Sequence, residues 1–391
     1  MDNKFHELDY KALILNNKIQ KTDNKFSNLD NKTKKVGILH MEQYRIDPNN
    51  GLEFGLYTLG DHLPDPNSGE RISAEQRIHE IIELAKLAEQ AGIDFFSVGE
   101  SHQDFFTTQA HTVVLAAIAQ ATEKIKISSS STIISTLDPV RAYEDFATLD
   151  LISKGRAEIV AGRASRVGNF DLLGYSLKDY EDLFEEKFDL LLQINENEIV
   201  NWEGKYRAPL RNAKVLPRPK NGSMPIWRAV GGTPASARKA GYAGVPMYLA
   251  HLGGPATIFK RSIDAYRDAL ESRGFDPADF PVSTAGFFYT AETTQQAQRE
   301  TYPHINEGMK RTNGQGFPKQ HFAQGADPRD VMNIGSPQEV IEKILYQHEL
   351  FGHQRYIAQM DFGGVTFDRL KRNIDTIGSE VLPAIRKYTK K

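Results

Sequence analysis

Cysteine is absent from this chain of 391 residues. Its absence excludes disulfide bonds, thiolate metal sites and catalysis by a thiol nucleophile, and it suits a reducing compartment. Tryptophan is scarce as well, with two residues, but a hydrophobic share of 40% is enough for a large buried core. The composition therefore indicates a globular protein.

Long apolar runs and an excess of charge of one sign are also missing. The longest early apolar run is "ALIL" at 12–15, which is too short for a signal-peptide core or a membrane span. The formal net charge of -3 shows no excess of positive charge of the kind that binds nucleic acid or acidic lipid. We therefore expect a cytoplasmic protein that has neither nucleic acid nor a membrane as its partner.

The first 35 residues differ from the rest, because they are rich in Asn, Asp and Lys and show little periodicity. Two interpretations stay open: a loosely ordered extension, or an arm laid on a neighbouring subunit. We expect residues 1–35 to form this polar extension and residues 36–391 to form one barrel domain.

From residue 36 onward, short β-branched runs alternate with longer segments of helical periodicity. This alternation is typical of a parallel sheet, and eight repeats close such a sheet into a (β/α)8 TIM barrel, an α/β fold. Two insertions, 41–72 after strand 1 and 290–335 after strand 7, lie beyond strand C-termini, where such a barrel carries its site. The predicted strands are 36–40, 93–100, 125–135, 156–162, 225–231, 245–251, 281–290 and 355–363.

Capping residues mark several helix starts. Ser73 is an N-cap with Gln76 three residues later, and Asp138 precedes Pro139 at the first helical position. The helix after the fifth strand begins in the same way, with Thr233 as N-cap before Pro234.

Polar residues stand where the predicted strands end, the positions that point at a ligand in such a barrel. Hydroxyls and glycines dominate, carboxylates are few, and an arginine closes the fourth strand, so a large polar anionic ligand is expected. The set comprises His40; Glu100, Ser101 and His102; Ser128 to Ser131; Arg163 and Ser165; Gly231, Gly232, Thr233 and Ser236; His251; Asp361, Gly363 and Gly364.

The segment "VGGTPAS", residues 230–236, is the sharpest motif. Gly231 and Gly232 remove Cβ atoms near the strand end, and a helix start with the hydroxyls of Thr233 and Ser236 is a phosphate cradle. Arg163 would add a guanidinium fork. An ordinary capped turn is the alternative for the motif, and a structural ion pair with Glu158 or Asp171 is the alternative for Arg163.

Several stretches together resemble the bacterial luciferase-like family of flavin-dependent monooxygenases. The resemblance covers residues 36–388 in order and is carried by "FFSVGESHQDFF", "ISSSSTIISTLDPVRAYEDFATLDLISKGRAEIVAGR", "PIWRAVGGTPASARKAGYAG", "NIGSPQEVIEKI" and "QMDFGGVTFDRLKRNIDTIGSEVLPAI". It implies a barrel that binds FMN, reduced by a separate reductase, and that uses O2 to oxidise a small organic substrate.

The resemblance also implies roles for individual residues. Arg163 matches the family's arginine after the fourth strand, and Thr233 and Ser236 match the hydroxyl pair at the phosphate. Ser130 and Ser131 match the position where the family often has a non-proline cis peptide under the flavin ring. Luciferase-like barrels commonly pair, so a homodimer is expected.

One position departs from the family. Luciferases have Glu-His-His after the second strand, whereas this chain has Glu100-Ser101-His102. Ser101 does not titrate near neutrality, so a catalytic base must be His102, His40 or a water. Structural roles for both histidines stay open.

Three functions remain open on this sequence. The first is an FMN-dependent monooxygenase, the second a deazaflavin-dependent oxidoreductase that transfers hydride, and the third a flavin-binding barrel without turnover. A metal-dependent hydrolase is disfavoured, because His40 has no second histidine beside it, and no metal is expected.

Overall fold

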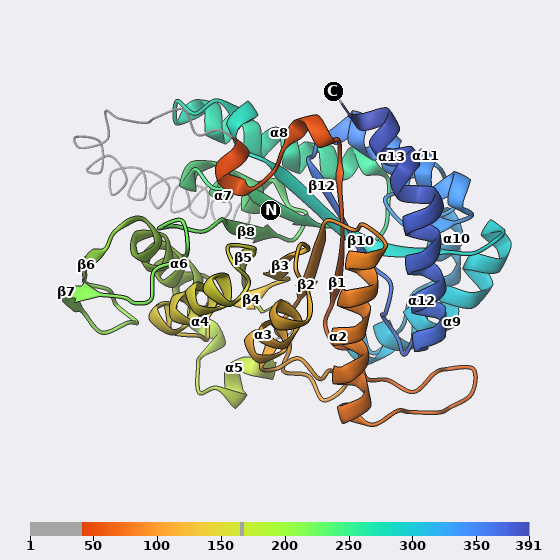
Figure 1. Cartoon of the computed structure of the whole chain (residues 1–391), viewed down its shortest axis with the longest axis horizontal. Coiled ribbons are helices and arrows are strands. Elements are labelled where there is room, and N and C mark those ends of the chain that lie inside the picture. Colours follow the sequence, from red (N-terminus) through yellow and green to blue (C-terminus); the bar gives the residue numbers. More distant parts are fainter. Residues whose placement is uncertain (1–40, 165–167, 391) are drawn as a thin grey trace, which may run out of the picture. The chain divides into compact units, whose positions relative to one another are not determined.

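The structure, a computed structural model, describes residues 41–164 and 168–390. Within these ranges parallel strands close into a barrel, because β1 pairs with β2 on one side and with β12 on the other. Figure 1 shows this barrel with helices around it. In pairing order, the strands are β1 (Glu53–Thr58), β2 (Phe95–Val98), β3 (Lys126–Ser129), β5 (Ala157–Gly162), β8 (Ile226–Val230), β9 (Met247–Ala250), β10 (Val282–Thr290) and β12 (Arg355–Gln359). The predicted (β/α)8 TIM barrel is confirmed.

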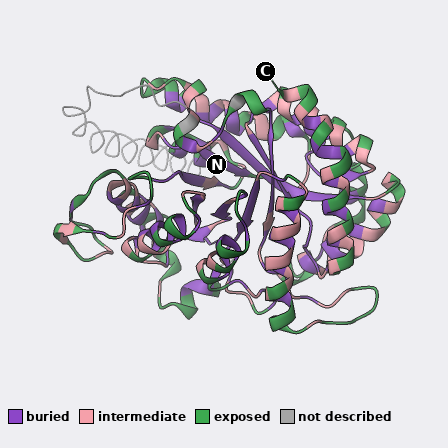
Figure 2. Cartoon of the chain, viewed as in Figure 1, coloured by how far each residue is buried: buried purple, intermediate pink, exposed green. Residues whose placement is uncertain are grey.

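A main helix follows each barrel strand. Figure 2 shows barrel strands that are mostly buried and helices that are buried mainly along the face turned to the barrel, as expected of amphipathic helices on a parallel sheet. These helices are α2 (Ala74–Gln90), α3 (His111–Ala121), α4 (Pro139–Ile152), α6 (Tyr180–Glu196), α7 (Pro234–Ala243), α8 (Ala256–Ser272), α11 (Pro337–Phe351) and α12 (Phe367–Thr376).

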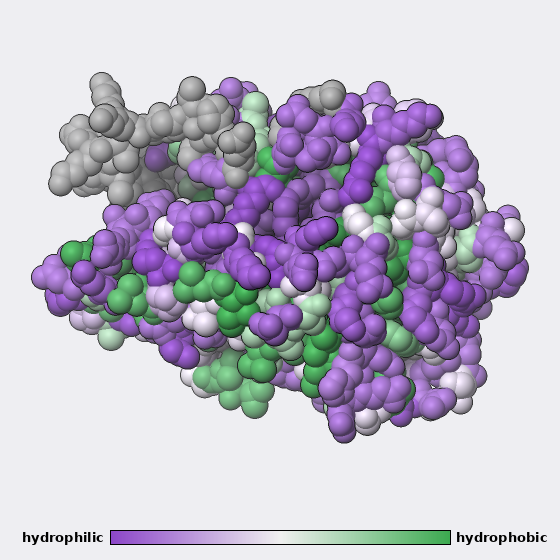
Figure 3. Space-filling view, viewed as in Figure 1, coloured by the Kyte–Doolittle hydropathy of each residue, from purple (hydrophilic) through white to green (hydrophobic). Residues whose placement is uncertain are grey.

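Smaller elements accompany the eight barrel strands and their main helices. They are the 3-10 turns Met41–Tyr44, Pro48–Asn50, Leu177–Asp179 and Pro277–Asp279, the strand β4 (Thr132–Ile133), the helix α5 (Gly168–Leu172), the hairpin β6 (Ile199–Trp202) and β7 (Leu210–Lys214), the helices α9 (Thr294–Asn313) and α10 (Lys319–Gln324), the strand β11 (Asn333–Gly335), the π-helical turn Ile377–Val381 and α13 (Leu382–Thr389). Around α5, hydrophobic residues reach the surface drawn in Figure 3, and Leu172 and Leu173 are exposed there. Among the described helices, none combines the length and the apolar character needed to cross a bilayer.

The predicted helix caps are present. The Ser73 hydroxyl accepts a hydrogen bond from the Gln76 amide at 3.0 Å. The Asp138 carboxylate accepts one from the Val140 amide at 2.8 Å, ahead of Pro139. These side chains satisfy amide groups that the first turn of a helix leaves without partners.

The structure corrects the predicted position of the first barrel strand. The sequence pattern places it at 36–40, which lies outside the described residues, whereas the barrel opens with β1 at Glu53–Thr58, inside the predicted insertion 41–72. Gly55 interrupts the apolar run of β1, so the sequence pattern does not show a strand there. The structure needs glycine at this position, because a Cβ at Gly55 would lie 2.8 Å from Cδ1 of the Phe95 ring. The insertion after strand 1 is therefore 59–73, and the one after strand 7 holds α9, α10 and β11.

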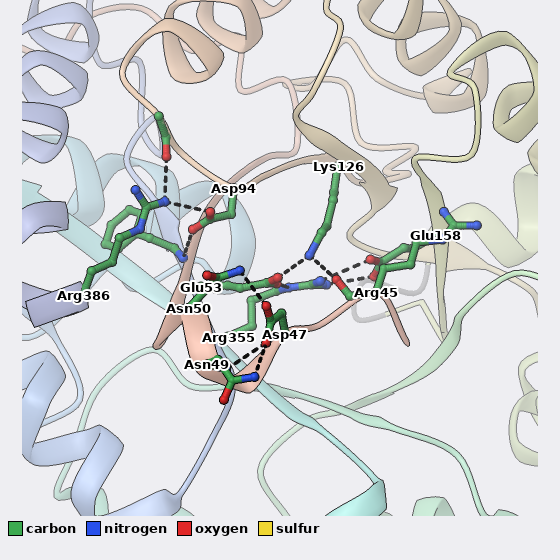
Figure 4. Close-up of polar contacts among 12 residues, drawn as sticks. Arg45, Asp47, Asn49, Asn50, Glu53, Asp94, Lys126, Glu158, Arg355 and Arg386 are labelled. Carbon is green, nitrogen blue, oxygen red and sulfur yellow. Dashed lines mark hydrogen bonds and ion pairs between the residues drawn. The ribbon is translucent and has the colours of Figure 1, made fainter. Parts of the chain in front are cut away.

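Charged residues fill the barrel at the end where its strands begin (Figure 4). Arg355 donates to Glu53 Oε2 at 2.8 Å, and its two Nη atoms donate to the Glu158 carboxylate at 2.8 and 3.1 Å. Lys126 Nζ donates to Glu53 and to the Arg45 carbonyl. Burial acts to raise the pKa of Glu158, but the charge and hydrogen bonds of Arg355, together with the charges of Lys126 and Arg45, outweigh it and the pKa is lowered. We call Glu53, Lys126, Glu158 and Arg355 the basal ion cluster.

Candidate active site

A cavity of about 440 Å³ lies where the barrel strands end. Its wall takes residues from five barrel strands, among them Tyr57 of β1, Phe287 of β10 and Gln359 of β12, and from the segments that follow the other three. From α9 it takes Met309 and Thr312. We call it the strand-end cavity. It occupies the face on which TIM barrels carry their sites, and the insertion after strand 7 contributes to its wall.

The predicted site residues divide into three groups. His102, Ser130, Ser131, Arg163 and Gly231 line the cavity. Gly232, Thr233 and Ser236 are not part of its wall but lie directly behind it, at the start of α7. His40 lies outside the described residues, as does Ser165.

Ser130 and Ser131 cross the floor of the cavity after β3, and the peptide bond between them is cis, as the family resemblance implies. Gly99 and Gly162 make room for this segment, because a Cβ at Gly99 would overlap the Ser130 carbonyl and one at Gly162 would overlap the Ser131 side chain. The Glu100 amide donates to the Ser131 carbonyl at 3.0 Å. The segment is thus fixed from the strands on both of its sides.

Hydroxyls of the serine run fall into two classes. Ser128 Oγ donates to the Glu158 carbonyl at 2.9 Å and Ser129 Oγ to the Val160 carbonyl at 3.2 Å, so both are bonded inside the barrel. Ser130 Oγ is bonded to Tyr248 Oη at the cavity wall. Burial raises the pKa of Tyr248, which keeps its phenol neutral.

Arg163 follows β5 and reaches the start of α7. Its Nη2 donates to Ser236 Oγ at 3.0 Å, and its Nη1 donates to Glu181 Oε1 at 2.6 Å. The guanidinium also lies over the rings of Tyr180 and Phe184, at 5.8 and 5.5 Å from their centroids. Neither Glu158 nor Asp171 is its partner among the described contacts. Arg163 is therefore held by side chains of α6 and α7 at the cavity edge.

The start of α7 has the predicted capped form. Thr233 Oγ1 accepts from the Ser236 amide at 3.3 Å, and Pro234 occupies the first turn. Gly232 has a φ of 89°, a conformation that strongly favours glycine, and its carbonyl accepts from Ser262 Oγ at 2.7 Å. We call Arg163, Thr233 and Ser236 the Arg163 cradle, since together they present a guanidinium, two hydroxyls and a helix N-terminus.

Glu100 and His102 form a pair in the cavity wall, in the segment after β2. His102 Nε2 lies 2.8 Å from Glu100 Oε1, and Glu100 Oε2 accepts from the Ile133 amide at 2.7 Å. The His102 side chain is 12% exposed, and Ser101 beside it is buried. Because a carboxylate accepts a hydrogen bond, it holds a proton on Nε2 and leaves Nδ1 as the basic atom of the neutral ring.

Asp361 follows the end of β12 and does not line the cavity, and its hydrogen bonds connect parts of the fold. It accepts from Thr58 Oγ1 and from Arg77 Nη2. Asp61 nearby accepts from the amides of Gly363 and Gly364 at 3.0 and 2.9 Å, and burial raises its pKa to about 6. His251, also at a strand end, is buried outside the cavity wall, and burial lowers its pKa to about 4.

Sequence reasoning missed several cavity residues. Tyr248 sits in a strand that reads as core, and Tyr57 belongs to the strand that the pattern did not find. Asn169 lines the cavity with a buried Oδ1 that has no partner among the described residues, while its Nδ2 donates to Thr136 Oγ1 at 3.2 Å. No sequence signal distinguishes this asparagine. Within the described ranges, no group of three or more His, Asp or Glu side chains is placed to hold a metal ion.

Comparison of the chain with curated proteins gives relatives that span most of the barrel. N-acetyl-S-alkylcysteine monooxygenase of Bacillus subtilis is 27% identical over 237 residues, which make up 59% of this chain and 67% of the relative. The alkanal monooxygenase alpha chain of Photorhabdus laumondii is 21% identical over 362 residues, 86% of this chain and 98% of the relative.

Solved structures share the fold. The monooxygenase RslO1 of Streptomyces bottropensis superposes with a TM-score of 0.72 at 24% identity, over 85% of this chain and 99% of its own. The oxygenating constituent of 3,6-diketocamphane monooxygenase of Pseudomonas putida, solved with FMN, gives 0.68 at 20% identity, over 85% and 98%. The coenzyme F420-dependent tetrahydromethanopterin reductase of Methanopyrus kandleri gives 0.65 at 20% identity, over 86% and 99%.

The family comparison covers most of the described barrel. Residues 52–354 match the family described as luciferase-like monooxygenase. This span runs from just before β1 to just before β12, so it contains the Arg163 cradle and all residues that line the strand-end cavity except Gln359 and Phe362. The chain therefore belongs to the luciferase-like monooxygenase family and is a flavin-dependent oxidoreductase.

Proposed function

We propose that the protein is an FMN-dependent monooxygenase that uses reduced flavin and O2 to oxidise a small organic substrate. The observation that carries the proposal is the Arg163 cradle, because Arg163 Nη2 and Ser236 Oγ meet at 3.0 Å at the start of α7, beside the cavity. A guanidinium, hydroxyls and free amides at a helix N-terminus are the groups that recognise a terminal phosphate.

The residues present fit FMN. Arg163, Thr233 and Ser236 would hold its phosphate, while Ser130, Ser131, Gly231 and Gly232 would line the ring and its chain. When bound, the reduced flavin supplies the electrons with which O2 is activated. The protein contributes binding, orientation and shielding.

His102 is the residue proposed for proton transfer. Glu100 Oε1 lies 2.8 Å from its Nε2 atom and fixes the proton there, so Nδ1 is the atom that accepts or returns a proton. Ser101 stands where luciferases have a histidine, and it cannot take over this role at neutral pH. His40 remains a second predicted base.

Apolar side chains form part of the cavity wall. Phe287 and Phe362 come from the barrel strands and the loop beyond β12, and Met309 comes from α9 in the insertion after strand 7. A bound flavin and movement of the insertion would close the cavity further, and exclusion of water protects reactive oxygen chemistry from hydrolysis. The substrate is a small molecule, because the cavity holds about 440 Å³.

Two partners and a second cofactor belong to the proposal. A separate reductase would supply the reduced flavin, and two copies of the chain would form a homodimer in the cytoplasm. The F420-dependent structural neighbour favours a second candidate, hydride transfer with a deazaflavin. A flavin-binding barrel without turnover is the third.

Parallel titrations of the apo-protein with FMN, reduced FMN and F420 test the proposal, followed by analysis of the small-molecule products on aeration. Free reduced FMN consumes O2 without a protein, so the readout is an oxygenated product and not O2 uptake. We expect reduced FMN to bind, and an oxygenated product to form only when protein and substrate are both present. Binding of F420 without affinity for FMN would instead establish the deazaflavin candidate. An absence of binding to all three would overturn both, whereas FMN binding without an oxygenated product would leave only the barrel without turnover.

A further inference from the structure

Arg163 is one end of a row of alternating charges that connects the end of β5 with α6, α7 and β8. Glu181 accepts from Arg163 at 2.6 Å and from Lys239 at 3.0 Å, with a different oxygen for each. Lys239 also donates to Glu185 at 2.9 Å, and Glu185 takes two hydrogen bonds from Arg228, at 2.9 and 2.6 Å. We call this row, Arg163–Glu181–Lys239–Glu185–Arg228, the charge ladder.

The two carboxylates of the ladder are held to different degrees. Glu185 faces Arg228, whose side chain is 2% exposed, and although burial acts to raise the pKa of Glu185, its bonds to Arg228 lower the pKa to about 2. The Glu181 side chain is 50% exposed and has Lys239 as an alternative partner. Glu181 can therefore leave Arg163 without becoming an unpaired buried charge, and Glu185 cannot move as easily.

Glu181 accepts the hydrogen bond of Arg163 Nη1, a donor that a bound phosphate would need. A bidentate arginine uses two parallel N–H groups on one anion, but here Arg163 Nη1 is on a carboxylate while Nη2 is on Ser236. A phosphomonoester carries about −1.5 to −2 charges at pH 7, against −1 for the carboxylate, and offers three acceptor oxygens. It therefore competes for Arg163 where a neutral group does not.

We propose that Glu181 is an internal competitor for Arg163, which a terminal phosphate displaces on binding and which thereby limits the affinity of the site for phosphorylated flavin. This inference rests on the proposed function, because it assigns the phosphate of the cofactor to Arg163. On displacement, Glu181 keeps its bond to Lys239, and the Arg163 cradle becomes complete.

The test compares FMN with riboflavin, which lacks the phosphate, by flavin fluorescence titration of the apo-protein. Glu181→Gln removes the competing charge, so the Kd for FMN should fall by up to roughly fivefold, the range expected for a partly exposed ion pair. The Kd for riboflavin should not change. Asp182→Asn is the matched control, because Asp182 is exposed in the same helical turn and accepts a hydrogen bond from Tyr206 Oη at 3.5 Å.

A double variant separates competition at Arg163 from a general effect of charge. In an Arg163→Ala background, Glu181→Gln should leave the Kd for FMN unchanged, since there is no guanidinium left to release. Glu181→Ala should act in the same direction as Glu181→Gln and covers the case in which the Gln variant folds poorly.

The outcomes distinguish this inference from the proposed function. Wild-type protein that binds FMN, together with a Glu181→Gln variant of equal or weaker affinity, would overturn the inference and leave the proposed function standing; weaker affinity would mean that Glu181 positions Arg163. Wild-type protein that binds neither FMN nor riboflavin, oxidised or reduced, would overturn both. A gain of equal size in Asp182→Asn would also overturn the competition at Arg163.

Discussion

Arg163 shows how one side chain depends on its surroundings. Its guanidinium is 17% exposed and touches two aromatic rings, a hydroxyl and a carboxylate, so its direction is set by α6 and α7. A sequence pattern can predict that an arginine follows a strand. The partner of that arginine depends on which helices the barrel places beside it.

Replacement of Arg163 by alanine should weaken FMN binding by about 1.5–3 kcal/mol, the contribution of hydrogen bonds to a charged group. That corresponds to roughly a ten- to hundredfold rise in Kd. Flavin fluorescence titration measures it. Arg141→Ala is the control, because Arg141 is exposed on α4 and pairs with Glu144. An unchanged FMN affinity in Arg163→Ala would show that Arg163 does not bind the phosphate.

Asp61 should make stability depend on pH. Burial raises the pKa of Asp61 to about 6, against 3.8 for an ordinary aspartate, so between these values the folded state holds a proton that the unfolded state has lost. The free energy of unfolding should therefore fall as pH rises from about 4 to about 6, by up to about 3 kcal/mol from this group.

Urea unfolding of wild type and Asp61→Asn over this pH range checks the prediction. The amide does not titrate, so the difference in unfolding free energy between the two proteins should change with pH in this window and stay constant above it. A difference that is constant from pH 4 to 6 would contradict a raised pKa at Asp61.

At the scale of elements, the capped start of α7 has a structural role and, on the proposed function, a role in phosphate binding. Thr233 satisfies the Ser236 amide, and the same residues form the Arg163 cradle. Helix α9 begins in the same way, since Thr293 Oγ1 accepts from the Gln296 amide at 3.2 Å. These two threonine caps of the described residues are therefore similar, and one of them lies in the proposed phosphate site.

This pair allows a matched experiment. Thr233→Ala and Thr293→Ala should each lower the free energy of unfolding by about 0.5–2 kcal/mol through loss of the cap. Only Thr233→Ala should also raise the Kd for FMN. Chemical denaturation and flavin titration measure the two effects, and equal FMN affinity in both variants would show that Thr233 is a cap and no more.

For the molecule as a whole, the basal ion cluster places charges where a barrel usually holds apolar residues. Arg355 is 1% exposed and Glu158 is fully buried, and both are satisfied by several hydrogen bonds. Such a cluster gives little net stability compared with a good apolar core, but removing one partner leaves a buried charge uncompensated.

Arg355→Met should therefore lower the free energy of unfolding by about 3–5 kcal/mol. Arg386→Met provides the comparison, because Arg386 pairs with Asp94 at 2.7 Å while its side chain is 37% exposed, and its loss should cost no more than about 1 kcal/mol. Denaturant unfolding monitored by circular dichroism distinguishes the two. Similar losses in both variants would show that burial of the basal ion cluster does not matter.

The sequence by itself determined the fold class and most of its elements. Strands of β-branched residues, caps such as Ser73 and Asp138, and the motif at 230–236 are local signals, because each depends on the backbone preferences of a few neighbouring residues. The resemblance further gave the position of the cis peptide at Ser130–Ser131. A strand interrupted by Gly55 carries no such local signal, and it was missed.

Only the tertiary structure decided which side chains meet. Glu181 lies 18 residues from Arg163 along the chain, Tyr248 lies 118 from Ser130, and Arg355 lies 197 from Glu158. Closing a barrel brings such positions together through strand register and helix packing, which no short segment encodes. The partners of a buried charge, and with them the exposure and pKa of the group, are therefore properties of the folded chain.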